Sequence, residues 1–266
     1  MGFPGVKLAL YLCGMFFLVA GRSHQKRAKR IIGGTSVDIE LVPYMLSLRL
    51  HGKHICGAVI IGKEWCLTAA HCCVAFHDPV RSGKLTVRSG TSNLHEGGDS
   101  RRVTQATRHE LYRDGDDDYD LCALRVETAF EYSNVTAPVK LPKLEKQSTH
   151  LIDGSVAGWG YTAADGTVLS PRLQLLNVSR VDLKDCKHAY RNSYTIHDDD
   201  VCYGSDNGWD GACQGDSGGP LVNRDFVLVG IVSFGAECGY SKLPDVYVDV
   251  TQFLEWIERT TRLHAE

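Results

Sequence analysis

Three short segments of the sequence carry side chains that suit nucleophilic catalysis. His71 lies beside Cys72, Asp120 precedes an apolar run, and Ser217 occupies a glycine-rich turn. A serine hydroxyl is a poor nucleophile at neutral pH, so it needs a base such as histidine to accept its proton. A carboxylate can hold that histidine in the required tautomer. Single histidines and aspartates are mostly structural and a glycine-flanked serine mostly marks a turn, so only the combination indicates catalysis.

The sequence around these residues predicts an all-β protein. Short runs rich in Val, Ile, Leu, Thr and Tyr alternate with clusters of Gly, Asp, Asn and Ser, which is typical of strands and turns. The clearest predicted strands are Met45–Leu50, Ala58–Ile61, Lys84–Arg88, Leu121–Arg125, Leu173–Asp182, Leu221–Phe234 and Val246–Val250.

One stretch near the end of the chain has the spacing of a helix. Residues 251–260 read TQFLEWIERT, with apolar side chains at 253, 254, 256 and 257, and Thr251 is a candidate cap. We therefore predict a terminal helix over about 251–263. The polar, proline-containing spacer Glu131–Thr149 divides the strands before it from those after it, which predicts β-units over about 31–140 and 141–250.

The first 30 residues read as two segments that are removed. Lys7 followed by the uncharged run Leu8–Ala20 predicts a signal peptide over 1–21, because the run falls well short of the roughly 20 residues that span a bilayer. Residues 22–30, RSHQKRAKR, then form a basic propeptide without cysteine. Cleavage after Arg30 would create the apolar amino terminus Ile31-Ile-Gly-Gly, which suits insertion into a protein interior.

The composition indicates in which compartment the protein works and which classes of partner are disfavoured. The chain has 266 residues, 43% of them hydrophobic, and ten cysteines. With an export signal, this many cysteines predicts disulfides in a secreted, extracellular protein. The six basic residues of the first 30 leave 23 Lys and Arg against 32 Asp and Glu after Arg30. This acidic balance disfavours nucleic acid and anionic membranes as partners, and we expect no membrane span.

In the order His, Asp, Ser, the motifs TAAHC (68–72), DLCAL (120–124) and GDSGGP (215–220) resemble those of the chymotrypsin and trypsin family of serine proteases. The resemblance covers residues 31–266 and includes IIGG at 31–34, GWG at 158–160 and SFG at 233–235. It implies two six-stranded antiparallel β-barrels with a C-terminal α-helix and a site in the cleft between them. It also implies a serine endopeptidase that needs no metal and no organic cofactor.

The resemblance assigns a role to each motif residue. Ser217 would be the nucleophile, His71 its general base, and Asp120 the group that orients His71. The backbone N–H groups of Gly215 and Ser217 would form the oxyanion hole. Asp216 would pair with the new amine of Ile31 once the bond after Arg30 is cut, which implies synthesis as a zymogen.

The resemblance places Gly211, Ser233, Gly235 and Asp245 in the substrate pocket. Gly211 stands at the floor, where trypsins have aspartate, and Asp245 stands on a wall where trypsin and chymotrypsin usually have glycine. This combination is similar to the brachyurins, crab collagenolytic proteases of broad specificity, and implies cleavage after Arg or Lys as well as Phe, Tyr or Leu. The alternative is that Asp245 hydrogen-bonds within the pocket and limits its depth, giving a narrow chymotrypsin- or elastase-like enzyme.

The resemblance also implies three disulfides: Cys56 with Cys72, Cys186 with Cys202, and Cys213 with Cys238. Cys66, Cys73 and Cys122 have no usual partner in the family. An extra bridge between Cys66 and Cys122 is one possibility, because both should lie on strands of one barrel. Cys73 would then be left over, either free or bonded to another chain.

Other features concern modification and partners. Asn134-Val-Thr and Asn177-Val-Ser are glycosylation acceptors. The acidic run at 114–118 lacks the glycine of a calcium loop, with Tyr119 at that place, so we expect an acidic loop rather than a metal site.

We expect a monomer that meets protein or peptide substrates, protein inhibitors of proteases and an activating protease at Arg30. The alternative from another class is a catalytically silent homologue that acts as a binding protein. Such homologues usually lose a triad residue, whereas His71, Asp120 and Ser217 are all present.

Overall fold

The computed structural model describes residues 1–2, 33–73, 80, 82–143, 153–161, 168–208, 210–236, 238 and 243–263. Arg30, Ile31, the predicted propeptide and all but two residues of the predicted signal peptide lie outside them.

The first barrel is a closed antiparallel sheet in the order β2-β3-β4-β7-β6-β5. The hairpin between its first two strands turns at His51 and Gly52, which both have positive φ, 51° and 76°. A two-residue turn with positive φ at both positions matches the right-handed twist of the strands that it connects. The strands are β2 Met45–Leu50, β3 Lys53–Ile60, β4 Trp65–Thr68, β5 Leu85–Ser89, β6 Asp99–Arg108 and β7 Cys122–Val126.

The second barrel closes because β9 pairs with both β8 and β10, and β1 (Thr35–Ser36) adds to the start of β9. Its strands are β8 Gly154–Gly158, β9 Gln174–Val181, β10 Asp200–Gly204, β11 Pro220–Asn223, β12 Leu228–Phe234 and β13 Asp245–Asp249. The predicted strand Leu221–Phe234 is therefore two strands, separated by a turn at Phe226 with φ 58°. Two six-stranded antiparallel barrels confirm the fold class that the resemblance implied.

The terminal helix is present, but it begins differently from the prediction. A 3-10 turn, η4 (Val250–Phe253), leads into α3 (Leu254–Thr261). The capping side chain belongs to Asp249, whose Oδ1 accepts a hydrogen bond from Thr251 N at 3.0 Å. The prediction of Thr251 as the cap was wrong, because Thr251 lies inside η4 and its hydroxyl donates to Asp249 Oδ1 at 2.7 Å.

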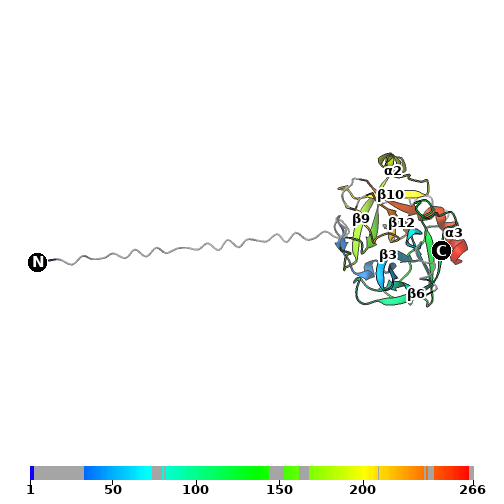
Figure 1. Cartoon of the computed structure of the whole chain (residues 1–266), viewed down its shortest axis with the longest axis horizontal. Coiled ribbons are helices and arrows are strands. Elements are labelled where there is room, and N and C mark those ends of the chain that lie inside the picture. The colour runs from blue at the N-terminus through cyan, green and yellow to red at the C-terminus, as the bar shows by residue number, and fades with distance from the viewer. Residues whose placement is uncertain are drawn as a thin grey trace.

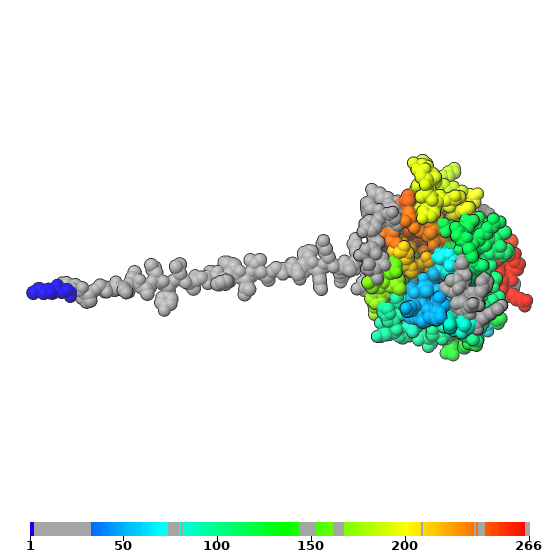
Figure 2. Space-filling view, viewed as in Figure 1, coloured from blue at the N-terminus to red at the C-terminus, as the bar shows by residue number. Residues whose placement is uncertain are grey.

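The described residues contain three further short helical segments: η1 Ile39–Leu41, η2 His71–Cys73 and α2 Leu183–Tyr190. The sequence did not predict α2. Its eight residues are too few for a clear period, although Asp182 caps it by accepting a hydrogen bond from Lys184 N. In the space-filling view α2 and α3 lie at separate places on the outside of the molecule (Figure 2).

Within the described ranges, one cluster of buried apolar residues spans both barrels, and two smaller clusters consist of residues from the second half of the chain. A single cluster of buried residues includes Met45 and Leu67 of the first barrel and Ile231 and Val248 of the second. The terminal helix α3 packs at the side of the first barrel, as Figure 1 shows, and Trp256 Nε1 donates to Glu110 Oε2 at 2.7 Å. Among the described residues, no helix has the length and apolar character needed to cross a membrane.

Candidate active site

His71 and Asp120 meet because they stand at the ends of neighbouring strands. His71 follows β4 in the turn η2, and Asp120 precedes β7; the last pair between these strands is Thr68 with Cys122. His71 Nδ1 lies 2.8 Å from Asp120 Oδ2, and His71 N donates to Asp120 Oδ1 at 2.8 Å. Both oxygens of the carboxylate therefore contact one histidine.

Asp120 accepts a third hydrogen bond from the other barrel. Ser233 Oγ, in β12, donates to Asp120 Oδ2 at 2.7 Å. The sequence had placed Ser233 only in the substrate pocket, so this contact with the carboxylate was missed. Asp120 is 1% exposed, and three donors make burial of its charge tolerable.

The carboxylate also sets the chemistry of His71. Burial lowers the pKa of His71, but the hydrogen bond and charge of Asp120, with the charge of Asp117, outweigh it and raise the pKa above its usual value. An ionised carboxylate only accepts, so the proton of neutral His71 sits on Nδ1 and Nε2 presents a lone pair.

Ser217 lies close to His71 without a direct hydrogen bond between their side chains among the described residues. His71 Nε2 is 3.6 Å from Cys72 Sγ, and the carbonyl oxygen of Ser217 is 3.8 Å from the same sulfur. The Cys56–Cys72 disulfide thus has the histidine and the backbone of Ser217 as neighbours.

The turn that carries Ser217 is held by strands of both barrels. Ser217 O accepts from Gly57 N in β3, and Gly218 N donates to Val232 O in β12, both at 2.8 Å. Gly218 has φ 78°, and a Cβ there would lie 2.1 Å from the Thr68 hydroxyl oxygen. Only glycine lets the turn approach β4 this closely.

Two hydrogen bonds fix the peptides on either side of Gly215. Tyr161 N donates to Gln214 O at 3.0 Å, and His54 Nε2 contacts Gly215 O at 2.8 Å. The N–H of Gly215 therefore points away from Tyr161, because it lies opposite the Gln214 carbonyl in a planar peptide. A hydrogen-bond donor with a fixed direction is what an oxyanion hole requires.

The protonation of His54 follows from its partners. Burial lowers its pKa to about 4, although the bond to Gly215 opposes this, so His54 is neutral near pH 7. A carbonyl only accepts, which puts the single ring proton on Nε2, and Nδ1 accepts from the Ser47 hydroxyl at 2.8 Å. Nothing in the sequence indicated this contact of His54, because His54 and Gly215 are 161 positions apart and no spacing links them.

Asp216 occupies a fully buried position lined by glycine. Its Oδ1 accepts from Gly160 N at 2.7 Å and its Oδ2 from Cys213 N at 3.0 Å. Burial raises the pKa of Asp216 to about 6, and these two bonds partly oppose that rise. A Cβ on Gly158 would lie 2.0 Å from Oδ1, and one on Gly160 would lie 2.2 Å from Oδ2. The carboxylate thus explains both glycines of the GWG motif.

The described ranges contain no cationic partner for Asp216. Ile31, its expected partner, lies outside those ranges.

Asp245, the first residue of β13, lies between two other glycines. Its Oδ2 accepts from Ala212 N at 2.7 Å, and a Cβ on Gly211 or Gly235 would lie 2.7 or 2.8 Å from its carboxylate oxygens. Burial raises the pKa of Asp245 to about 7, and the bond from Ala212 opposes the rise. Gly211, Gly235 and Asp245 are therefore brought together as the sequence predicted.

The backbone beside Asp245 is supported from α2. Tyr190 is fully buried, and its hydroxyl donates to Pro244 O at 2.7 Å. The disulfide Cys213–Cys238 joins the chain before the Ser217 turn to the chain after β12. The helix and the bridge together hold the segments that the resemblance assigns to the substrate pocket.

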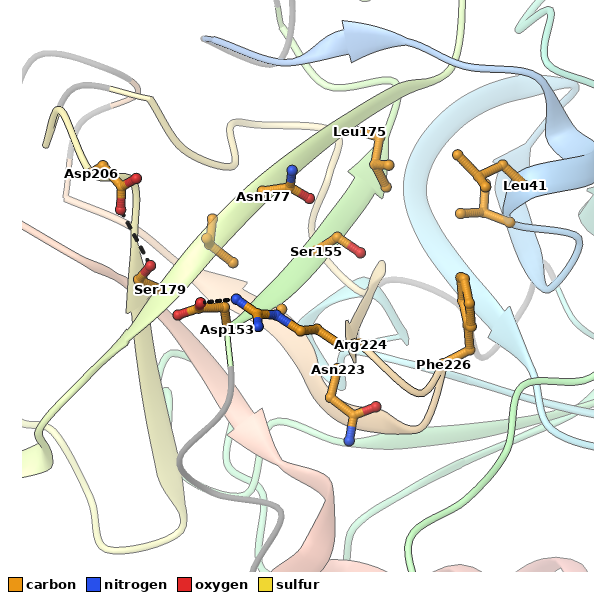
Figure 3. A pocket seen from close by; sticks show the side chains of 13 residues that line it. Leu41, Asp153, Ser155, Leu175, Asn177, Ser179, Asp206, Asn223, Arg224 and Phe226 are labelled. Carbon is orange, nitrogen blue, oxygen red and sulfur yellow. Dashed lines mark hydrogen bonds and ion pairs between the residues drawn. The ribbon is translucent and has the colours of Figure 1, made fainter.

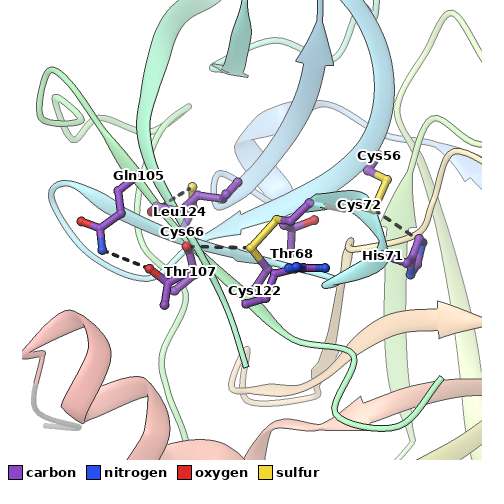
Figure 4. The surroundings of a disulfide bond; sticks show 12 residues. Cys56, Cys66, Thr68, His71, Cys72, Gln105, Thr107, Cys122 and Leu124 are labelled. Atoms are coloured by element: carbon purple, nitrogen blue, oxygen red, sulfur yellow. Dashed lines mark hydrogen bonds between the residues drawn. A yellow bond between two sulfur atoms is a disulfide. The ribbon is translucent and has the colours of Figure 1, made fainter. Parts of the chain in front are cut away.

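The cysteines correct one expectation. Cys56–Cys72, Cys186–Cys202 and Cys213–Cys238 are the three implied pairs, but the fourth joins Cys73 to Cys122 and leaves Cys66 free and buried. The bridge between Cys66 and Cys122, which the sequence left as one possibility, is not formed. In the register of β4 and β7, Cys66 lies opposite Leu124 and Thr68 lies opposite Cys122, so the two sulfurs are not brought together (Figure 4).

One group in the described part of the chain places three potential metal ligands close together: Cys56, His71 and Cys72. The two sulfurs are bonded to each other, so they are not available as thiolate ligands.

Both predicted glycosylation acceptors have exposed side chains. Asn134 Nδ2 donates to Glu40 Oε1 at 2.9 Å. Asn177 is on β9, where it lines a surface pocket with Phe226 and the Arg224–Asp153 ion pair (Figure 3).

Comparison with known proteins agrees with the fold. The sequence model of the family described as Trypsin matches residues 31–257, and the chain belongs to this family of serine proteases. A curated relative is Trypsin 5G1 of Aedes aegypti, which is 34% identical over 271 residues. That alignment covers 97% of this chain and 99% of the relative.

The glycine contacts of Asp216 generate a stability prediction. Gly158→Ala places a methyl group 2.0 Å from a buried carboxylate oxygen, so the strand or the Ser217 turn has to move. We expect a loss of about 1–3 kcal/mol in the free energy of unfolding, the usual cost of overpacking. Urea denaturation followed by tryptophan fluorescence measures it.

Gly204→Ala is the matched control, since a Cβ at that strand position would have its nearest neighbour at an ordinary 3.7 Å. Equal stability of the two variants would contradict the account of the GWG motif.

Proposed function

We propose that the protein is a secreted serine endopeptidase, synthesised with a signal peptide over 1–21 and a propeptide over 22–30. The observation that carries the proposal is the buried Asp120 carboxylate, hydrogen-bonded to a His71 whose Nε2 lies 3.6 Å from Cys72 Sγ, the sulfur that also lies 3.8 Å from Ser217 O. Membership of the trypsin family supports the reaction class.

In the proposed reaction, His71 Nε2 takes the proton of the Ser217 hydroxyl as its oxygen attacks the scissile carbonyl. Asp120 stays ionised and stabilises the imidazolium that forms. The oxyanion is bound by the N–H groups of Gly215 and Ser217, each worth about 3 kcal/mol of barrier. His71 then gives its proton to the leaving amine, and water hydrolyses the acyl-enzyme by the same route in reverse.

The proposed zymogen control follows from the burial of Asp216. Among the described residues the buried Asp216 carboxylate has two backbone hydrogen bonds and no counter-charge, and burial of an unpaired charge costs several kcal/mol. The amine of Ile31, released by cleavage after Arg30, would supply that charge. An uncut chain would leave the Ser217 turn misformed.

For specificity we propose the broad interpretation, with Asp245 as the acceptor for Lys or Arg side chains. Its carboxylate lies against Gly211 and Gly235, the positions assigned to the floor and wall, and Ala212 N is the backbone donor to its Oδ2. Apolar side chains would leave Asp245 protonated or hydrated at modest cost. The narrow chymotrypsin- or elastase-like enzyme and the inactive binding homologue are the alternatives that the next experiments decide.

The first test concerns catalysis. Because nucleophile and base act as one unit, Ser217→Ala and His71→Ala should each reduce kcat by at least about 10⁴-fold without unfolding the protein. Peptide hydrolysis by the purified, activated chain measures this. Ser100→Ala, at an exposed serine of β6, is the control. Activity retained in Ser217→Ala, or organophosphate labelling that survives it, would sink the mechanism.

The second test concerns activation. Arg30→Gln should leave the chain uncut and nearly inactive, whereas Arg22→Gln, elsewhere in the propeptide, should not. Mass spectrometry of active material should find Ile31 at the amino terminus. Full activity in an Arg30→Gln chain shown to be uncut would contradict the role of Asp216.

The third test concerns Asp245. Asp245→Gly should lose about 2 kcal/mol of transition-state binding for Arg peptides, roughly 30-fold in kcat/KM, and little for matched Phe peptides. Asp206→Asn, an exposed charge of the same barrel, should change neither value.

The pH dependence has a defined sign. Because the pKa of Asp245 is raised to about 7, the carboxylate gains its charge only as pH rises through that value. The ratio of kcat/KM for Arg over Phe peptides should therefore increase from pH 6 to pH 8.5, while the His71 titration cancels in the ratio. A pH-independent ratio, or no cleavage after Arg and Lys, would leave the narrow alternative standing.

A further inference from the structure

Two consecutive cysteines follow His71, and each is tied to a different strand. Cys72 is bonded to Cys56 in β3, and Cys73 is bonded to Cys122, the first residue of β7. Figure 4 shows the Cys56–Cys72 bridge beside His71 and the bridge of Cys122 deeper in the barrel. The turn η2 is thus fastened on two sides.

The Cys73–Cys122 bridge closes a ring that contains the His71–Asp120 pair. Each of these two residues stands two positions before one cysteine of the bridge. Two three-residue segments are therefore joined at one end by the disulfide and at the other by the 2.8 Å hydrogen bonds. The two middle residues of the ring are buried as well: Cys72 at 3% exposure and Leu121 at 0%.

The bridge stands where the sheet no longer connects the two segments. The pair of Thr68 with Cys122 is the last of the β4–β7 ladder, and beyond it one chain enters η2 while the other runs back into the loop between β6 and β7. That loop carries the exposed acidic residues Asp114 and Asp116 and contains Tyr119 at φ 54°. Asp120 therefore joins a fixed strand to a long surface loop.

We propose that the Cys73–Cys122 disulfide is a positioning element of the active site, which holds η2 against the start of β7 so that the hydrogen bonds between His71 and Asp120 keep their geometry. This inference rests on the proposed function, because it concerns the residues assigned as base and orienting acid. Neither cysteine is placed to touch a substrate, and both act through His71 and Asp120.

Loosening the ring has an electrostatic consequence that can be measured. The charged groups that act on His71 are Asp120 and Asp117, and the hydrogen bond to Asp120 is the largest of the effects that raise the pKa of His71. Burial opposes it and does not depend on the alignment of that bond. If His71 and Asp120 separate, the effects of Asp120 that raise the pKa of His71 weaken. Burial, which lowers this pKa, is then less opposed, and the pKa falls.

The remaining thiol supplies a local control. Cys66 is fully buried in the same barrel, 3.8 Å from Leu124 O, and burial raises the pKa of its thiol well above the usual range. Cys66→Ala removes a buried sulfur from β4 without opening the bridge. The pair Cys186–Cys202, which ties α2 to β10, supplies a second control that opens a disulfide of the other barrel.

The kinetic experiment compares Cys73→Ala/Cys122→Ala with the unsubstituted chain, Cys66→Ala and Cys186→Ala/Cys202→Ala. In the first variant kcat should fall on the order of 10-fold to 100-fold, as for a small misplacement of catalytic groups, with KM nearly unchanged. The acid limb of its kcat/KM profile should move toward lower pH. Cys66→Ala should keep the unsubstituted kcat and acid limb, and Cys186→Ala/Cys202→Ala should keep the acid limb, even where thermal stability drops.

A second readout does not depend on turnover. In a Ser217→Ala background, NMR titration of the His71 ring should give a lower pKa when Cys73 and Cys122 are replaced and an unchanged pKa in both controls. Should the alanine pair fail to fold, Cys73→Ala/Cys122→Val is the alternative, because it places a β-branched apolar residue in the strand.

The two proposals fail in different ways. An unsubstituted chain without peptidase activity overturns the proposed function, and the His71 titration still decides the positioning role. A bridge-free variant with unsubstituted kcat, acid limb and His71 pKa overturns the positioning role alone.

Discussion

Burial of the Asp120 carboxylate is the constraint on which the rest of the site depends. Its oxygens receive two hydrogen bonds from His71 of the first barrel and one from Ser233 of the second. A buried carboxylate is stable only while its oxygens accept hydrogen bonds. A shift of one barrel against the other would break some of these bonds and cost several kcal/mol of folding free energy. The packing of the two barrels against each other and the orientation of His71 therefore depend on each other.

Two further buried carboxylates, those of Asp216 and Asp245, shape the backbone around them in a common way. Asp216 fills the space that a Cβ on Gly158 or Gly160 would need, and Asp245 does the same at Gly211. These glycines are dictated by a neighbouring side chain rather than by a left-handed turn, since none of the three has positive φ. Gly215 and Gly218 differ, because their positive φ values aim the turn around Ser217.

Much of this arrangement was predictable from the sequence, because its signals are local. Apolar β-forming runs marked strands such as Met45–Leu50, and short motifs marked His71 and Ser217. Polar strands such as β6, which reads DSRRVTQATR, gave no such signal, because one face of a barrel strand meets solvent. The contact of His54 with Gly215 and the pairing of Cys73 depend on which residues the closed barrels bring together. Those long-range contacts leave no mark in the spacing of residues along the chain.

The distribution of the disulfides has a consequence for the integrity of the whole molecule. Among the described residues each bridge joins two cysteines of the same barrel: Cys56–Cys72 and Cys73–Cys122 in the first, Cys186–Cys202 and Cys213–Cys238 in the second. A nick in the spacer between β7 and β8 therefore produces two fragments with no covalent link. Their association then depends on the shared apolar core and on cross-barrel contacts such as Trp159 Nε1 with Ser92 O at 3.0 Å. We therefore expect a chain nicked in this spacer to stay assembled in native buffer. In denaturant its two fragments should separate without a reductant.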